Sequence, residues 1–400
     1  MKFFYKNELK KLWPFYLNSL LAPLLFFAPA FIIVFLNDLN LSYLQIGILL
    51  AISPLFSLIF EIPTGAIADL YGRKFSVLLG LLIEAFTLLS LFFVREYYLL
   101  LILFSLWGFG ATLSSGSDEA WVVDLVKKNK NFVKSFFHKS QSFGAFSLIF
   151  SGIIGAFLVQ QFGIPSIWIF AFISYILSIL ILLFAEENYV RKKIKIKASI
   201  KELFKQTKKT ISYGFRHHVL YYYLIATFLF SAVTLFSMGP TWTPLLLELN
   251  FPRPYFGYMW SAISFISMIA PIISSKLLKE GKEKIFIMVS LAISGIIALF
   301  ILLPQSWFFA LLVLLSIQFF FVLRMPASYI YFHKFTPSKL RSTMGSVKSM
   351  LSSLAVIIFL PVVGYLIDII GARYAIFLYA PLTIPVIWIY SKIKEKEMKK

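Results

Sequence analysis

Twelve long apolar segments, separated by short polar turns, occupy most of the 400 residues of this chain. A helix of about 20 apolar residues spans the hydrocarbon core of a bilayer, and a helix satisfies its backbone hydrogen bonds internally. The pattern therefore predicts an all-α integral membrane protein with twelve transmembrane helices. The predicted spans are residues 12–36, 44–68, 75–94, 97–121, 140–161, 165–185, 218–247, 254–277, 284–303, 306–332, 342–367 and 373–391.

The amino-acid composition supports this class. Apolar residues make up 60% of the chain and charged residues 14%, whereas soluble domains average about half and about a quarter. The 45 phenylalanines suit a surface that faces lipid. Because the chain has no cysteine, it cannot form a disulfide framework, a thiolate metal site or a cysteine nucleophile.

The distribution of basic residues predicts the orientation of the spans. If the N-terminus is cytoplasmic, all of the 38 Lys and Arg residues except Arg95, Arg253 and Arg373 lie in cytoplasmic segments or at cytoplasmic helix ends. This positive-inside pattern predicts a multi-pass protein of the cell membrane with both termini in the cytoplasm. It also accounts for the net charge of +20 without nucleic acid as a partner, because the basic residues lie in short runs between spans.

A basic segment divides the chain into two sets of six spans. Residues 186–217 connect an N-terminal half, residues 1–185, to a C-terminal half, residues 218–400, which ends in a short basic tail. Within the segment, Ser199-Ile-Lys-Glu202 has the capping-box pattern, and apolar residues then recur at helical spacing. We expect an amphipathic helix on the inner leaflet here; a solvated tether is the alternative.

The turn between the second and third spans has an unusual composition. It reads Gly-Ala-Ile-Ala-Asp-Leu-Tyr-Gly-Arg-Lys and begins at Gly65. Gly65 and Gly72 allow close approach or a sharp bend of the backbone, and Arg73 and Lys74 favour the cytoplasmic side. An acid at a membrane boundary is costly unless it is paired or caps a helix, so Asp69 is expected to have a specific partner.

This turn resembles the signature loop between helices 2 and 3 of major facilitator superfamily transporters, Gly-x-Leu-Ala-Asp-Arg-x-Gly-Arg-Lys. Two positions depart from the pattern: Ile67 replaces leucine, and Leu70 replaces the first arginine. The resemblance implies two pseudo-symmetric halves of six helices and a substrate site near the midplane between them. The second-half copy of the loop, at residues 276–284, is degenerate, since it keeps lysines and Gly281 but lacks the acid and the Gly-Arg-Lys.

The fourth span contains a second, more specific resemblance. Residues 115–124, Ser-Gly-Ser-Asp-Glu-Ala-Trp-Val-Val-Asp, look like a pattern common in drug or tetracycline-type members of the superfamily. Arg341-Ser-Thr resembles the start of helix 11 in the same group. The resemblance implies proton-coupled export of a small amphiphilic or drug-like compound.

Three acids in the spans are candidates for proton coupling: Asp118, Glu119 and Glu61. An ionisable residue inside a membrane is costly and usually functional, and burial raises the pKa of a carboxyl group toward neutral pH. Neighbours on a helix point about 100° apart, so only one of Asp118 and Glu119 can face a cavity squarely. The alternative for this pair is a local bond to the serines of residues 114–117.

Two further acids are expected to be structural. Glu84 lies on the third span, which packs outside the cavity in the superfamily, so it is expected to bond to a neighbouring helix. Asp368 lies near the outer end of the eleventh span, where Arg373 is close in sequence, and a surface ion pair is expected there.

Arg324 is the only charged residue of the tenth span before its cytoplasmic end. It cannot lose its proton, so it cannot carry one. It is a candidate for the substrate cavity, where it would pair with an acid of the fourth span or bind an anionic substrate. The alternative is that it extends to the lipid headgroups.

The signature turn also predicts contacts of a gate at the cytoplasmic side. Asp69 is expected to cap the start of the eleventh span near Arg341, and Arg73 is expected to pair with Asp124. Both roles are implied by the resemblance, in the state that is open to the outside. Leu70 cannot contribute the contact of the arginine that it replaces.

Secondary active transport by alternating access is therefore the predicted function, with proton-coupled export preferred over import of a nutrient or metabolite. A membrane scaffold or receptor that transports nothing is the alternative from another class. The sequence contains no P-loop, no H-E-x-x-H and no G-x-S-x-G, so an ATP-driven transporter or a hydrolase is not expected. The expected partners are a small-molecule substrate, the proton and the bilayer; no cofactor is expected, and the protein is expected to be monomeric.

Overall fold

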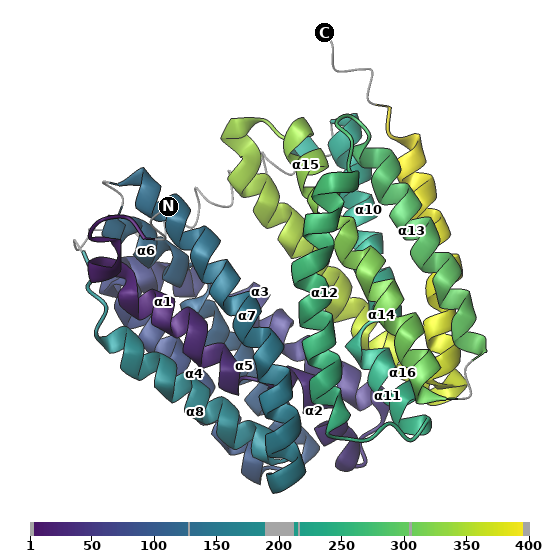
Figure 1. Cartoon of the computed structure of the whole chain (residues 1–400), viewed down its shortest axis with the longest axis horizontal. Helices are drawn as coiled ribbons and strands as arrows, with labels where there is room; N and C mark the ends of the chain where they lie inside the picture. The colour runs from purple at the N-terminus through teal and green to yellow at the C-terminus, as the bar shows by residue number, and fades with distance from the viewer. Residues whose placement is uncertain (1–3, 127–128, 189–211, 215–216, 304–305, 395–400) are drawn as a thin grey trace. The chain divides into compact units, whose positions relative to one another are not determined.

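The computed structural model describes residues 4–126, 129–188, 212–214, 217–303 and 306–394, and these residues form helices and no strands (Figure 1). In this described part of the chain, eleven helical segments are long and apolar enough to cross a membrane. The last contains two spans, because the 52 residues of α16 (Arg341–Lys392) would extend about 78 Å as one straight helix. Gly371 interrupts it at φ 80°. The predicted all-α membrane fold is confirmed.

The first six spans are built from eight helices. Their bounds are α1 Glu8–Leu25, α2 Ala28–Asp38, α3 Tyr43–Tyr71, α4 Arg73–Phe93, α5 Tyr97–Ser114, α6 Ser117–Val126, α7 Lys130–Phe162 and α8 Ser166–Leu183. Within this group α1 packs along α7 and α8, while α4 packs between α5 and α8. The helix predicted within residues 199–215 lies almost entirely outside the described residues.

The last six spans follow the same plan. Their helices are α10 His218–Thr234, η1 Leu235–Ser237, α11 Gly239–Glu248, α12 Tyr255–Leu277, α13 Glu283–Leu299, η2 Phe300–Leu302, α14 Trp307–Leu323, α15 Met325–Phe335, η3 Ser338–Leu340 and α16. Both α10 and α13 pack along α16 (Figure 1).

Within the described residues four spans are interrupted, and they are the first and fourth of each set of six. Three of the breaks precede a helix with proline at its first or second position, namely Pro29 in α2, Pro240 in α11 and Pro326 in α15. Proline lacks a backbone N–H and clashes with the carbonyl four residues earlier, so a continuous helix is broken there. The fourth break, between α5 and α6, occurs at Gly116, whose φ of 69° favours glycine.

The described residues group into two compact units. One contains those within 1–40, 52–196 and 253–264, and the other contains those within 41–51, 197–252 and 265–400. The start of α3 therefore groups with the last six spans, and the start of α12 groups with the first six. The half boundaries predicted at residues 185 and 218 stay a prediction.

Close helix contacts account for this grouping. Gly152 of α7 faces Gly257 of α12, and the Ser261 hydroxyl donates to a carbonyl of α7 at 2.5 Å. In the other unit, Asp368 of α16 accepts from the backbone N–H groups of Tyr43 and Leu44, both at 2.9 Å. The expected ion pair of Asp368 is wrong: the carboxylate caps α3, whose first N–H groups have no partner within the helix.

Candidate transport site

The signature turn links α3 to α4 through Gly72, whose φ is 103°. Arg73 is the first residue of α4, and its Nε donates to Asp124 Oδ2 of α6 at 2.8 Å. Both side chains are partly exposed, at 29% and 44%. The predicted contact between Arg73 and Asp124 is present, and it joins the start of the third span to the end of the fourth.

The same turn also holds the end of the sixth span. Lys74 Nζ donates to the carbonyls of Leu183 and Ala185 at 2.7 and 2.8 Å. The Glu187 carboxylate accepts from the backbone N–H of Lys74 at 2.9 Å and so caps α4. A Cβ on Gly72 would lie 3.0 Å from both Glu187 oxygens, which would have to shift slightly, whereas the φ of 103° itself favours glycine. Sequence reasoning missed Glu187.

The second set of spans repeats this arrangement with the charges exchanged. Gly281 has a φ of 74° and precedes Glu283, the first residue of α13. Glu283 accepts from Lys334 of α15 at 3.3 Å, so the acid is now on the helix start and the base on the helix end. Lys284 Nζ donates to the carbonyls of Ser391 and Ile393 at 3.2 and 2.8 Å, as Lys74 does in the first set. The motif is degenerate in sequence, but its contacts are retained.

This exchange of charges yields a stability prediction. The single reversal Arg73→Glu should lower the free energy of unfolding by up to about 1 kcal/mol, because it places two carboxylates together at a partly exposed site. The double variant Arg73→Glu/Asp124→Lys copies the polarity of Glu283 and Lys334, and it should recover most of the loss. Thermal melting in detergent measures both. A double variant that melts no higher than the single one would contradict the equivalence of the two sites.

The remaining residues of the predicted cytoplasmic gate are Gly65, Asp69 and Arg341. Gly65 and Asp69 are exposed on α3. Arg341 donates to the carbonyls of Thr336 and His333 at 3.3 and 3.4 Å, which holds it at the start of α16. Asp69 and Arg341 belong to different units, so the predicted contact of Asp69 with the eleventh span stays a prediction.

The break in the fourth span creates a helix start where the two adjacent acids lie. Asp118 and Glu119 occupy the first turn of α6 and are exposed. Unpaired N–H groups and the helix dipole favour negative charge at such a position. Asp118 Oδ1 accepts from the backbone N–H of Glu119 at 2.7 Å, whereas no hydrogen bond joins the Glu119 carboxylate to another described residue. The Ser114 hydroxyl donates to Glu84 and not to Asp118 or Glu119, so the alternative of a local bond from this serine to the two acids is not seen.

The remaining acids of the first set differ in burial. Glu61 is exposed on α3, and its carboxylate has no hydrogen bond with the described residues. Glu84 is 4% exposed and accepts from Tyr175 of α8 at 2.9 Å and from Ser114 of α5 at 3.3 Å. The expected structural bond of Glu84 to neighbouring helices is confirmed.

Arg324 lies at the break between α14 and α15 and is 6% exposed. Its guanidinium carbon is 3.3 Å from the ring centroid of Phe230 on α10 and 5.1 Å from that of Phe321 on α14. Extension to the headgroups is therefore wrong for this residue. The guanidinium instead borders a cavity of about 520 Å³ within the second unit. A pair with Asp118 or Glu119 would join the two units and stays a prediction.

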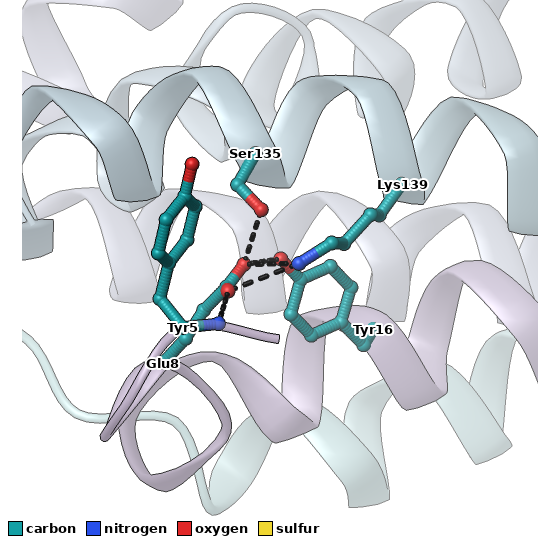
Figure 2. Close-up of polar contacts among 5 residues, drawn as sticks. All are labelled: Tyr5, Glu8, Tyr16, Ser135 and Lys139. Atoms are coloured by element: carbon teal, nitrogen blue, oxygen red, sulfur yellow. Dashed lines mark hydrogen bonds and ion pairs between the residues drawn. The ribbon is translucent and has the colours of Figure 1, made fainter. Parts of the chain in front are cut away.

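A buried carboxylate that sequence reasoning missed lies at the start of the first span (Figure 2). Glu8 is fully buried and accepts from the Tyr16 hydroxyl at 2.5 Å and from Ser135 Oγ at 2.7 Å. Lys139 Nζ contacts both of its oxygens at 3.0 Å, and the N–H of Tyr5 completes the set at 2.7 Å. This Glu8 cluster fastens α1 to α7.

Within the described residues, no group of three His, Asp or Glu side chains can hold a metal ion. Three features of the described residues place charged groups at helix ends. These are the carboxyls at the break in the fourth span, the arginine at the break in the tenth span, and the charged turns that hold the helix ends.

Comparison with known proteins agrees with this architecture. A family model described as Major Facilitator Superfamily matches residues 15–323 and 279–400. The uncharacterized MFS-type transporter YxaM of Bacillus subtilis strain 168 is 24% identical over 384 residues, which cover 93% of this chain and 94% of that protein.

Solved structures share the fold. A D-xylose-proton symporter superposes with a TM-score of 0.72 at 13% identity, covering 95% of this chain and 97% of that one. The nucleoside transporter NupG gives 0.71 at 15% identity, covering 94% of this chain and 98% of that one. At these identities the likeness concerns the fold alone.

Proposed function

Because the chain belongs to the major facilitator superfamily, we propose that it is a secondary active transporter that exports a small amphiphilic compound in exchange for protons. In this proposal two halves alternate around a central site, and both termini lie in the cytoplasm. Export is favoured by the likeness of residues 115–124 to the drug-type pattern. The drug-type assignment is part of the proposal.

The single observation that carries the proposal is the set of four interrupted spans. Discontinuous helices at corresponding positions of two repeats are typical of substrate and ion sites in transporters, because a helix end exposes unpaired polar groups. Here the break in the fourth span carries two acids, and the break in the tenth span carries a buried arginine. The titratable group and the fixed charge thus lie at corresponding places in the two repeats.

Glu119 is our first candidate for the residue that carries the proton. Asp118 Oδ1 already accepts a backbone hydrogen bond within its own helix turn, so that oxygen is engaged by the protein. Glu119 has no such bond among the described residues and is exposed. In the proposed cycle its carboxyl takes a proton from the outer side and releases it to the cytoplasm, while substrate moves outward. Glu61 is the next candidate.

Amide substitutions test this assignment. Glu119→Gln should abolish accumulation driven by a pH gradient and keep downhill exchange of substrate for substrate, because a neutral amide mimics the protonated carboxyl. Asp118→Asn should keep both activities, since asparagine also accepts at a helix start. Both are measured in proteoliposomes with the labelled compound that most raises the melting temperature among a panel of amphiphiles. If both single variants still accumulate substrate, neither acid is the coupling site.

The direction of flux separates export from import. An exchanger accumulates substrate in vesicles with an acidic interior, whereas a carrier that moves substrate and protons together accumulates it in vesicles with an alkaline interior. A scaffold or receptor would show no protein-dependent flux under either gradient.

A further inference from the structure

We propose that the cavity beside Arg324 binds the negatively charged group of a small organic anion, so that the substrate class is amphiphilic anions rather than cations or neutral compounds. This inference rests on the proposed function, because it names what the transporter carries. It concerns residues of the second unit only.

The first observation is a buried guanidinium that forms no ion pair with a carboxylate of the described residues. Arg324 is 6% exposed, and its Nε is buried without a hydrogen-bond partner. The ion pairs found among the described residues do not include it. A buried charge is costly unless it is paired and hydrogen-bonded. A bound anion would supply the opposite charge and the hydrogen-bond acceptor that Arg324 lacks.

The second observation is another cation on the same wall. Lys348 of α16 borders the cavity, and its Nζ lies 5.5 Å from the ring centroid of Tyr223 and 5.2 Å from that of Phe332. It also takes part in none of the ion pairs among the described residues. Among the described residues, no Asp or Glu lines the cavity. Two cations without an acid make the lining electropositive.

The third observation concerns the rest of the lining, which suits an apolar body. Phe230, Phe321 and Tyr390 contribute rings, and Ser231 and Ser352 contribute hydroxyls that bond to each other at 3.0 Å. A cavity of about 520 Å³ lies within the usual size of small-molecule sites. Arginine binds planar oxyanions through two parallel hydrogen bonds, and its face stacks on aromatic rings. The lining therefore fits an aromatic carboxylate, sulfonate or phosphate ester.

Binding of a matched series of naphthalene compounds tests whether the cavity selects a negatively charged ligand. In nanodiscs of neutral phosphatidylcholine, a naphthalene sulfonate should raise the melting temperature, while the naphthyl alcohol and the naphthyl ammonium of the same size should not. Arg324→Gln and Lys348→Gln should each weaken sulfonate binding about ten-fold or more, since each removes a charged hydrogen-bond donor. Arg95→Gln, on an exposed loop, should leave binding unchanged. A shift with the ammonium compound, no shift with the sulfonate, or an unchanged shift in both Gln variants would overturn the proposal.

The unliganded Arg324 variant separates a binding role from a structural one. If the role of the arginine is to bind an anion, Arg324→Met without ligand should melt at a temperature equal to or above that of the wild type. The reason is that the substitution removes an uncompensated buried charge. If the arginine serves to stack on Phe230, the variant should melt lower, and the proposal would be wrong.

A lipid phosphate is the other source of the same anionic chemistry. We commit to a free organic anion, and nanodiscs that contain phosphatidylglycerol distinguish the two. If the lipid alone raises the melting temperature in an Arg324-dependent manner and prevents sulfonate binding, the site is a lipid site and the proposal fails. These assays measure binding only, so a failure of transport with intact sulfonate binding would contradict the proposed function and not this inference.

Discussion

Replacing Glu8 by alanine should lower the free energy of unfolding by about 3–5 kcal/mol, the usual cost of removing one partner of a buried ion pair. Glu8 is fully buried and accepts from four groups, which come from α1, α7 and the residues before α1 (Figure 2). The substitution removes the carboxylate that Lys139 contacts and the acceptor of Tyr16. The melting temperature of the detergent-solubilised protein reports the loss.

Two comparisons make this result specific. Glu96→Ala, at an exposed helix start without a side-chain cap, should change stability by no more than about 0.5 kcal/mol. Glu8→Leu/Lys139→Met removes both charges and should be more stable than either single variant, because no buried charge is then left. If Glu8→Ala has the same melting temperature as Glu96→Ala and the wild type, the Glu8 cluster does not fasten α1 to α7.

Replacing Gly108 by leucine should destabilise the first unit by about 1–3 kcal/mol or more, because it overfills a contact between backbones. A Cβ at Gly108 of α5 would overlap the carbonyl oxygen of Ser53 on α3 and lie 2.8 Å from its Cα. Backbone atoms cannot rotate away as a flexible side chain can, so the two helices would have to separate. The Ser57 hydroxyl, which donates to the Gly108 carbonyl at 3.1 Å, would lose its partner.

Gly144→Leu is the matched control. A Cβ at Gly144 of α7 meets nothing within 4 Å. Leucine is the better helix former, so this variant should be at least as stable as the wild type. Equal melting temperatures for the two leucine variants would contradict the close packing of α3 on α5.

The spans were largely predictable from local chemistry, whereas their breaks were not predicted. Apolar length predicts the spans. Proline does not by itself predict the breaks, because it occurs at a break, as Pro29 does, and also inside unbroken helices, as Pro54 and Pro271 do. The contact of Arg73 with Asp124 could be predicted because the signature turn and the end of the fourth span carry recognisable residues. The corresponding contact of the second set could not be predicted, because there the acid, Glu283, lies at the helix start and the base, Lys334, lies at the helix end.

Contacts between distant positions were not predictable from one sequence. Glu8 and Lys139 are 131 residues apart, and Glu8 precedes the predicted first span. Glu187 and Lys74 are 113 apart and meet only because the sixth span returns to the signature turn. For Arg324 the sequence left open a pair with an acid of the fourth span, binding of an anionic substrate and extension to the lipid headgroups. The burial of its side chain over Phe230 excludes the last of these. Helix periodicity gives the face of a residue but not its neighbour across the bundle.

Proton-coupled transport is tested by the accumulation of a labelled naphthalene sulfonate in proteoliposomes. The sulfonate stays ionised at all working pH values, so a pH gradient alone cannot concentrate it across a lipid bilayer. We expect accumulation above the external concentration in vesicles with an acidic interior, collapse of the substrate gradient by a protonophore, and loss of accumulation with retained exchange in Glu119→Gln. Uptake that matches protein-free vesicles under gradients of either direction would contradict it.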